Sequence, residues 1–189
     1  MRPGQAVAER RGSISIRRWR KLPGPEAREA AMEFTAKTRA CLFLADQAEQ
    51  AADCYVALFP GSTIDNVVRP DPAGPALVVE FTLAGTPYMT LNGNPEPASS
   101  HTFSISVLTD DQAETDRLWQ ALTADGGEPG RCGWLRDRFG VHWQIVPRAL
   151  PLLMSSGDAA RGQRVQAALM AMGRIDIAAL EAAAESQTA

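Results

Sequence analysis

Polar residues alternate with apolar ones along three segments that have the composition of β-strands. The polar members of these segments are Glu80, Thr82, Thr102, Ser104, Ser106, His142 and Gln144. Because successive side chains of a strand point to opposite faces, the apolar members are expected to pack on helices and the polar members to share the other face. The sequence predicts that this face encloses a small-molecule cleft; the alternative is a face that is simply solvated, as in many antiparallel sheets.

Three residues of this face carry groups that suit catalysis. The imidazole of His142, the amide of Gln144 and the carboxylate of Glu80 could bind a divalent ion or transfer protons. We therefore predict these three as catalytic residues, and His142 and Gln144 as the candidate metal ligands. A strand histidine can equally be a hydrogen-bonded surface group, so both interpretations stay open.

Aromatic and sulfur-containing residues are expected beside the same face. Trp134 and Cys132 are predicted near its rim, and Phe103 and Trp143 are predicted to supply stacking or packing surface. Arg131 precedes Cys132 and could favour its thiolate, although without a paired base the thiol would be inert. The ligand-binding residues predicted from the strands and this rim are Thr102, Phe103, Ser104, Cys132, Trp134 and Trp143.

The glycine-rich segment 126–130 is not a nucleotide-binding motif. It follows a predicted helix and precedes a predicted strand, which is the reverse of a phosphate-cradling loop. The chain has no glycine-rich turn from a strand to a helix elsewhere. A nucleotide or S-adenosylmethionine cofactor is therefore not predicted, and a divalent metal ion remains the candidate cofactor.

A repeated tetrapeptide organises the elements that carry these residues. Asp46-Gln47-Ala48-Glu49 recurs 65 residues later as Asp111-Gln112-Ala113-Glu114, and each copy follows a short apolar run, 40–44 or 103–108. These runs are predicted strands. In each copy the Asp is predicted to cap a helix whose Glu, three residues on, returns the bond.

The rest of the pattern repeats as well. Amphipathic spacing predicts a helix over 48–59, ended by Pro60-Gly61, and a second one around 118–122, ended by Gly126-Gly127. Further strands are predicted at 64–68, 76–83, 88–91, 133–135 and 141–146. From Pro147 onward the composition is helical, with a Met and Leu stripe that suits packing. The sequence thus predicts an α+β fold of two βαβββ modules that form a curved mixed sheet around a cleft, followed by C-terminal helices.

Charge is distributed unevenly along the chain. The formal net charge is -3, but residues 1–31 hold eight basic and three acidic residues, a charge of +5, and the remainder holds 11 basic and 19 acidic residues, a charge of -8. An acidic body repels phosphate backbones, so nucleic acid is not an expected partner of the folded part. Residues 1–36 are predicted to be a disordered basic extension. It could be an arm for nucleic acid or anionic membranes, a targeting peptide, or sequence upstream of a true start at Met32.

The remaining composition predicts one cytoplasmic domain. No run of about 18 apolar residues suggests a membrane span, and no secretory signal is present. Three cysteines without ligand-like spacing indicate neither a disulfide framework nor a zinc knuckle. A domain of this size can form a core without such staples.

Three blocks of the sequence resemble the PhnB-like family of the vicinal oxygen chelate superfamily, which includes glyoxalases and extradiol dioxygenases. They are Cys41–Ser62, Leu91–Gly93 and the Cys-Gly-Trp-Leu to Trp-Gln-Ile-Val-Pro block at 132–147, and the segment Ile175–Leu180 fits as well. The resemblance covers about residues 38–185, which we predict as one domain. It implies paired βαβββ modules and a homodimer.

The resemblance also suggests where a metal would be held. In metal-dependent members, His or Glu side chains of the first and last strands of each module bind one divalent ion. The corresponding positions here are Arg39, Leu91 or Asn92, Thr102 and Gln144, none of which is a carboxylate or a histidine. Gln144 can still offer an oxygen, and His101 or His142 an imidazole, but a complete ligand set is not present. Asn92 joins the predicted ligand-binding residues on this ground. Family members are often labelled demethylubiquinone methyltransferases, but this sequence has no methyl-donor motif.

Three functions remain open from the sequence. The first is a small-molecule-binding protein that acts as a lyase, isomerase or dioxygenase-like enzyme. The second is a non-catalytic dimeric module that sequesters its ligand, which the incomplete metal shell favours. The third is an assembly role for the C-terminal helices with a vestigial cleft. A shared fold does not decide among them.

Overall fold

The computed structural model describes residues 37–93, 101–155 and 158–186. The chain divides into two units, Met1–Thr38 and Arg39–Ala189, and everything below concerns the second. The basic extension predicted for residues 1–36 lies outside the described residues. Within the described ranges, none of the helices has the length and apolar character needed to cross a bilayer.

The first module has the predicted order of elements. It consists of β1 (Ala40–Leu44), α2 (Ala48–Leu58), β2 (Thr63–Val68), β3 (Val78–Leu83) and β4 (Thr86–Asn92). The strands form a sheet in the order β1-β4-β3-β2, in which β1 runs parallel to β4 and the other pairs are antiparallel. Every boundary lies within two residues of its predicted place.

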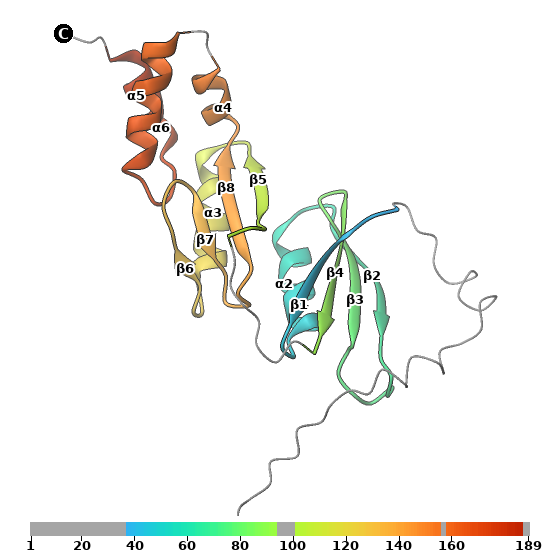
Figure 1. The fold of residues 1–189 in the computed structure, drawn as a ribbon. Helices are drawn as coiled ribbons and strands as arrows, with labels where there is room; N and C mark the ends of the chain where they lie inside the picture. Colours follow the sequence, from blue (N-terminus) through green and yellow to red (C-terminus); the bar gives the residue numbers. More distant parts are fainter. Residues whose placement is uncertain (1–36, 94–100, 156–157, 187–189) are drawn as a thin grey trace, which may run out of the picture. The chain divides into compact units, whose positions relative to one another are not determined.

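The second module repeats this arrangement (Figure 1). It consists of β5 (Ile105–Thr109), α3 (Gln112–Thr123), β6 (Glu128–Pro129), β7 (Trp134–Arg136) and β8 (His142–Pro147). The sheet order is β5-β8-β7-β6, with β5 parallel to β8. The two-module α+β fold is thus confirmed, as two mixed sheets of four strands each. The short strand β6 was not predicted, because its residues belong to the glycine-rich segment 126–130, which shows no strand alternation.

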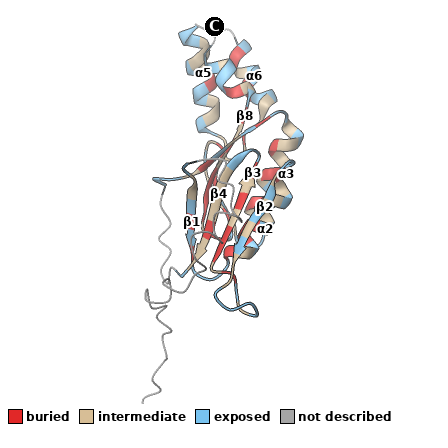
Figure 2. Ribbon diagram, turned by 90° about the vertical axis from the view of Figure 1, so that its right-hand side faces the viewer, coloured by how far each residue is buried: buried red, intermediate tan, exposed pale blue. Residues whose placement is uncertain are grey.

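Three helices follow the second module. They are α4 (Ala149–Met154), α5 (Ala159–Met170) and α6 (Ile177–Glu185). The side chains of Asp158 and Asp176 cap the N-termini of α5 and α6. The helices enclose a small core of their own, formed by Leu150, Val165, Ile175, Leu180 and Ala184. Figure 2 shows that α5 and α6 carry few buried residues compared with the strands.

The two repeated tetrapeptides start their helices in different ways. Asp111 caps α3 as predicted, accepting a hydrogen bond from the backbone N–H of Glu114 at 2.8 Å. Asp46 does not cap α2: the N-cap position is Gln47, without a side-chain bond. Instead Oδ1 of Asn92, at the end of β4, accepts the N–H of Ala48 at 2.8 Å. The predicted first capping box was therefore wrong, because a side chain from a neighbouring strand replaces the local cap.

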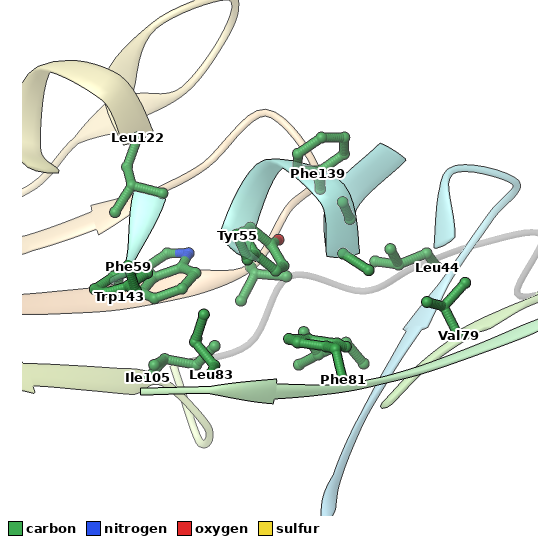
Figure 3. Close-up of a cluster of buried hydrophobic side chains, with 14 of the residues drawn as sticks. Leu44, Tyr55, Phe59, Val79, Phe81, Leu83, Ile105, Leu122, Phe139 and Trp143 are labelled. Atoms are coloured by element: carbon green, nitrogen blue, oxygen red, sulfur yellow. The ribbon is translucent and has the colours of Figure 1, made fainter. Parts of the chain in front are cut away.

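One hydrophobic core joins the two modules. Tyr55 and Phe59 of α2 pack against Trp143 of β8, with ring centroids 5.1 and 5.9 Å apart. Tyr55 also meets Phe139 edge-on at 5.8 Å. Figure 3 shows these rings together with the apolar residues of β3. Since each large aromatic ring removes about 150–250 Å² from water, the cluster ties α2 firmly to the second sheet.

A buried carboxylate reinforces this junction. Asp137, which is almost fully buried, accepts the hydroxyl of Tyr55 at 2.7 Å and the indole N–H of Trp143 at 2.8 Å on one oxygen. Its other oxygen accepts the backbone N–H groups of Phe139 and Val141, both at 2.9 Å. Burial raises the pKa of Asp137, and the four donors oppose that rise. Asp137 thus links α2 to the turn before β8.

Candidate functional site

The predicted polar face of the second sheet is present. Trp134 pairs with Gln144 across the ladder, and Arg136 pairs with His142. Directly paired residues project to the same side of a sheet, so these four side chains share one face. The opposite face carries Leu135, Trp143 and Ile145, which are buried in the core. The alternation read from the sequence therefore assigned the faces of β8 correctly, while the face of β7 follows from its pairing with β8.

Three rings cluster on this face. The imidazole of His101 lies over that of His142, with centroids 4.3 Å apart and planes inclined by 38°. The ring of Trp134 lies 5.8 Å from His101. His142 is only 6% exposed, whereas His101 is exposed and Trp134 is half-buried. His101 and Trp134 thus present ring surface to solvent, above a covered second imidazole.

Polar pairs flank the rings. The amide nitrogen of Gln144 donates to the hydroxyl oxygen of Ser104 at 2.8 Å. At the other side, the guanidinium of Arg136 is paired with the carboxylate of Glu128 on β6. We call the set His101, Ser104, Trp134, Arg136, His142 and Gln144 the histidine face.

The electrostatic environment keeps His142 neutral at pH 7. Burial lowers the pKa of its imidazole, and the nearby charges of His101 and Arg136 lower it further. Asp137 and Glu128 act in the opposite direction with smaller effect. Since an ordinary histidine titrates near pH 6.5, a lowered pKa leaves the ring uncharged at neutral pH.

Glu80, predicted as a catalytic residue, lies in the other sheet. One of its carboxylate oxygens is paired with the guanidinium of Arg39, and the other accepts the side-chain amide of Asn66 at 3.0 Å. Both groups of the ion pair are largely buried. Both oxygens of Glu80 are thus engaged within the first module, whereas His142 and Gln144 lie together in the second.

Two predicted ligand-binding residues have structural partners. Asn92 caps α2, and its amide nitrogen donates to the carbonyl oxygens of Asp46 and Ala76 at 3.1 and 2.9 Å. Trp143 is fully buried between α2 and the second sheet. Its ring therefore has no exposed surface for a ligand, and its packing role explains its position.

The other predicted ligand-binding residues lie in loops. Thr102 and Phe103 precede β5 and are exposed, Phe103 to 50%. Cys132 lies in the turn before β7, where its Sγ is 3.6 Å from Sδ of Met170 at the end of α5. Cys132 therefore faces the C-terminal helices, while Trp134, two residues later, belongs to the histidine face. Enclosure of this face in a cleft stays a prediction.

The donor set does not fit a resident divalent metal. Within residues 37–93, 101–155 and 158–186, no three His, Cys, Asp or Glu side chains converge in a way that could hold an ion. Of the positions that the resemblance suggested for ligands, Arg39 is paired with Glu80, Asn92 binds backbone groups and Gln144 binds Ser104. These contacts use the side chains within the protein, so we derive no chemistry through a metal.

His101 was considered only as an alternative imidazole for a metal and was not among the predicted site residues, although its ring contacts both His142 and Trp134. It precedes the apolar run of β5, and strand alternation therefore assigned it no face. Its contact with His142 joins residues 41 positions apart. The weak available signal was the chain's content of only two histidines, both beside predicted strands.

Comparison with protein families gives one match. Residues 36–146 match the model of the family described as 3-demethylubiquinone-9 3-methyltransferase. This range contains both modules up to the last residues of β8 and leaves out α4, α5 and α6. No curated protein has significant similarity to the sequence.

Solved structures are also similar to this chain over about the same range. A PhnB protein from Bacillus cereus, which carries the same methyltransferase description, is 27% identical with a TM-score of 0.54, over 59% of this chain and 99% of that one. A protein from Pseudomonas aeruginosa is 23% identical with a TM-score of 0.50, over 60% and 98%. The fosfomycin resistance protein FosX from Listeria monocytogenes, described with Mn(II) and sulfate, is 11% identical over 59% and 88%, with a TM-score of 0.41. At that score the Mn(II) of FosX does not extend to this chain.

Proposed function

The chain belongs to the PhnB-like family described as 3-demethylubiquinone-9 3-methyltransferase, and from that membership we propose that it binds a small molecule on the histidine face of its second sheet. The observation that carries the proposal is the contact of His101 with both His142 and Trp134, beside the hydrogen-bonded Gln144 and Ser104. Two ring surfaces and two polar groups are thereby held within reach of one ligand.

The chemistry of this face favours a planar aromatic ligand that carries a hydroxyl or carbonyl group. Exposed faces of His101 and Trp134 offer stacking, which is worth about 0.5–1.5 kcal/mol beyond area burial for an aromatic pair. The Gln144–Ser104 bond uses the amide nitrogen and the hydroxyl oxygen, which leaves the amide oxygen as an acceptor and the hydroxyl proton as a donor. Glu128 balances the charge of Arg136, so an uncharged ligand suits the face best.

Methyl transfer does not follow from the family description. The turns from β1 to α2 and from β5 to α3 are Ala45-Asp46-Gln47 and Asp110-Asp111, without glycine. The described strand-to-helix connections therefore lack the close backbone approach by which glycine-rich turns hold a nucleotide-like cofactor. A dioxygenase activity would need a metal site, and among the residues that the structure describes no such group of ligands converges.

Binding is tested with 2-naphthol and its saturated counterpart, decahydro-2-naphthol. Both carry one hydroxyl, but only 2-naphthol is planar and aromatic. By calorimetric titration we expect 2-naphthol to bind about 2–10-fold more tightly, and Trp134→Leu to remove most of that preference. Phe43→Leu is the matched control, because Phe43 is an exposed aromatic residue of the first module. Equal affinity of wild type and Trp134→Leu would contradict the proposed site.

The neutral His142 supports a second candidate function, proton transfer in an isomerase or lyase. A neutral imidazole can act as a general base near pH 7. Exchange of the C1 protons of 2-tetralone in D₂O, followed by NMR, measures this activity directly. A rate that falls to background in His142→Gln would support catalysis, and equal rates in the two proteins would leave ligand binding alone.

The metal question has its own test. After loading with nickel, zinc, manganese or iron(II), elemental mass spectrometry should find well below one ion per chain in wild type, with no change in His142→Ala. About one ion per chain, lost in the variant, would overturn the metal-independent function. We further propose that the protein is a homodimer, as the family resemblance implies, and that it is located in the cytoplasm.

A further inference from the structure

The C-terminal helices extend the chain beyond the part that matches the family. The match ends at residue 146, whereas α4, α5 and α6 continue to Glu185. The segment 172–177, which comprises most of the connection between α5 and α6 and the first residue of α6, returns to the second module and contacts it at several points. These contacts lie immediately before Trp134 in the sequence, which connects the extension to the histidine face.

Backbone hydrogen bonds join this connection to the turn before β7. The N–H of Cys132 donates to the carbonyl of Met172, and the N–H of Gly133 donates to the carbonyl of Gly173, both at 2.8 Å. The guanidinium of Arg131 donates to the carbonyl of Met170. The turn 131–133 is therefore paired with the extension along its whole length.

The packing at Gly133 leaves the turn little freedom. Gly133 has φ +84°, and a Cβ there would lie 2.6 Å from the carbonyl oxygen of Ile145 and 2.9 Å from Cδ1 of Ile175. Cys132, which is not a glycine, also has a positive φ of 57°, a conformation that costs energy unless its surroundings impose it. Ile175 is fully buried. The turn is thus packed tightly between β8 and Ile175 of the extension.

Gln112 of α3 clamps the same connection. Its amide nitrogen donates to the carbonyl of Ile175 at 3.1 Å, and its amide oxygen accepts the N–H of Ile177 at 2.8 Å. One turn further along α3, Asp116 is paired with Arg174. Residues 172–177, which we call the C-terminal brace, are therefore fixed to α3 and to the turn 131–133.

We propose that the C-terminal brace positions Trp134 against His101 and so sets the affinity of the histidine face for aromatic ligands. The N–H of Trp134 donates to the carbonyl of Arg131 at 3.0 Å, so the braced turn fixes the backbone from which the indole projects. This inference rests on the proposed function for its ligand. Gln112, which touches neither the rings nor the site, is a positioning residue.

Gln112→Leu is the variant that tests the brace. It removes both side-chain bonds to the connection, and we expect the affinity for 2-naphthol to fall about fivefold. A second readout needs no ligand: the ring protons of His101 sense the Trp134 ring current, and with two histidines in the chain their NMR signals are readily assigned. These signals should shift, and alkylation of Cys132 by iodoacetamide should speed up about fivefold relative to Cys41.

Arg164→Leu is the matched control. Arg164 donates to the carbonyls of Ala183 and Ala184, so its loss loosens α5 against α6 without touching the brace. A folded Gln112→Leu protein with unchanged His101 signals and unchanged affinity for 2-naphthol would overturn the inference. Equal changes of both quantities in Arg164→Leu and Gln112→Leu would overturn it as well. Shifted His101 signals in a protein that fails to bind 2-naphthol would support the brace and reject the proposed ligand instead.

Discussion

The two modules share an order of elements but hold their helices by different means. In the second, Asp111 caps α3 from within its own tetrapeptide. In the first, Asn92 caps α2 from the end of β4, 44 residues away. The same backbone donors at a helix start need a partner in both cases. The comparison shows that a repeated fold fixes which bond must be made, and leaves open which residue makes it.

The polar faces of the two sheets also differ in how their side chains are paired. On the first, Arg39, Asn66 and Glu80 satisfy one another. On the second, two imidazoles and an indole meet beside Gln144. A closed ion pair offers a ligand little, because separating its charges costs energy. Exposed rings offer stacking surface at no such cost, which is why we propose the second sheet as the ligand site.

The largest expected loss of stability comes from a change at Asp137, which links the two modules. Asp137→Asn keeps the shape of the side chain but replaces one oxygen by an N–H₂ group, so two of the four donors lose their acceptor. We expect the free energy of unfolding to fall by about 3 kcal/mol. Urea denaturation followed by tryptophan fluorescence and by circular dichroism measures the loss.

Asp53→Asn is the matched control, since Asp53 is exposed on α2 and its change should cost less than about 0.5 kcal/mol. Both probes should report one shared transition for Asp137→Asn, because a single core spans the modules. Two separate transitions would mean that the modules are independent, and an effect as small as that of Asp53→Asn would show that the buried network contributes little.

Local patterns in the sequence were sufficient for most of the fold. Strand β1 coincides with its predicted range, and α2 begins at the predicted Ala48. Helix periodicity and strand alternation are local properties, and the duplication supplied the same information twice. The alternation also assigned His142 and Gln144 to one face and Trp143 to the other, which the pairing of β8 with β7 bears out.

The missed features depend on contacts between distant residues. His101 gains its place only through His142, and Asn92 gains its role only when β4 lies beside the start of α2. The partner of Glu80 could not be read from β3 alone, because Arg39 precedes a different strand. Likewise the contact of Cys132 with Met170 of α5 joins residues 38 positions apart. The pattern of residues along a single strand or helix does not indicate which distant residues will contact it.

The difference in capping can be measured directly. Asn92→Ala removes one acceptor and two donor bonds to the backbone of three segments, so we expect a loss of about 2–3 kcal/mol in the free energy of unfolding. Asp111→Ala removes one capping bond and should cost about 1 kcal/mol. Urea midpoints of the two variants, measured side by side, give the ratio. Equal losses would mean that the distant cap stabilises its helix no more than the local one.

The smallest expected effect concerns the pH dependence of the histidine face. Because the pKa of His142 is lowered in the folded protein, the unfolded chain binds more protons between that pKa and about 6.5. The contribution of His142 to stability is therefore complete above pH 6.5 and is lost as the pH falls below it. His142→Gln should remove this slope, so that wild type loses stability relative to the variant between pH 8 and pH 5.5.

Asp137, whose pKa is shifted in the opposite direction, is present in both proteins, and its contribution cancels in the difference. A gap between the two urea midpoints that stays constant across this range would show that His142 titrates as it does in the unfolded chain, and would remove the electrostatic argument for a neutral imidazole at this site.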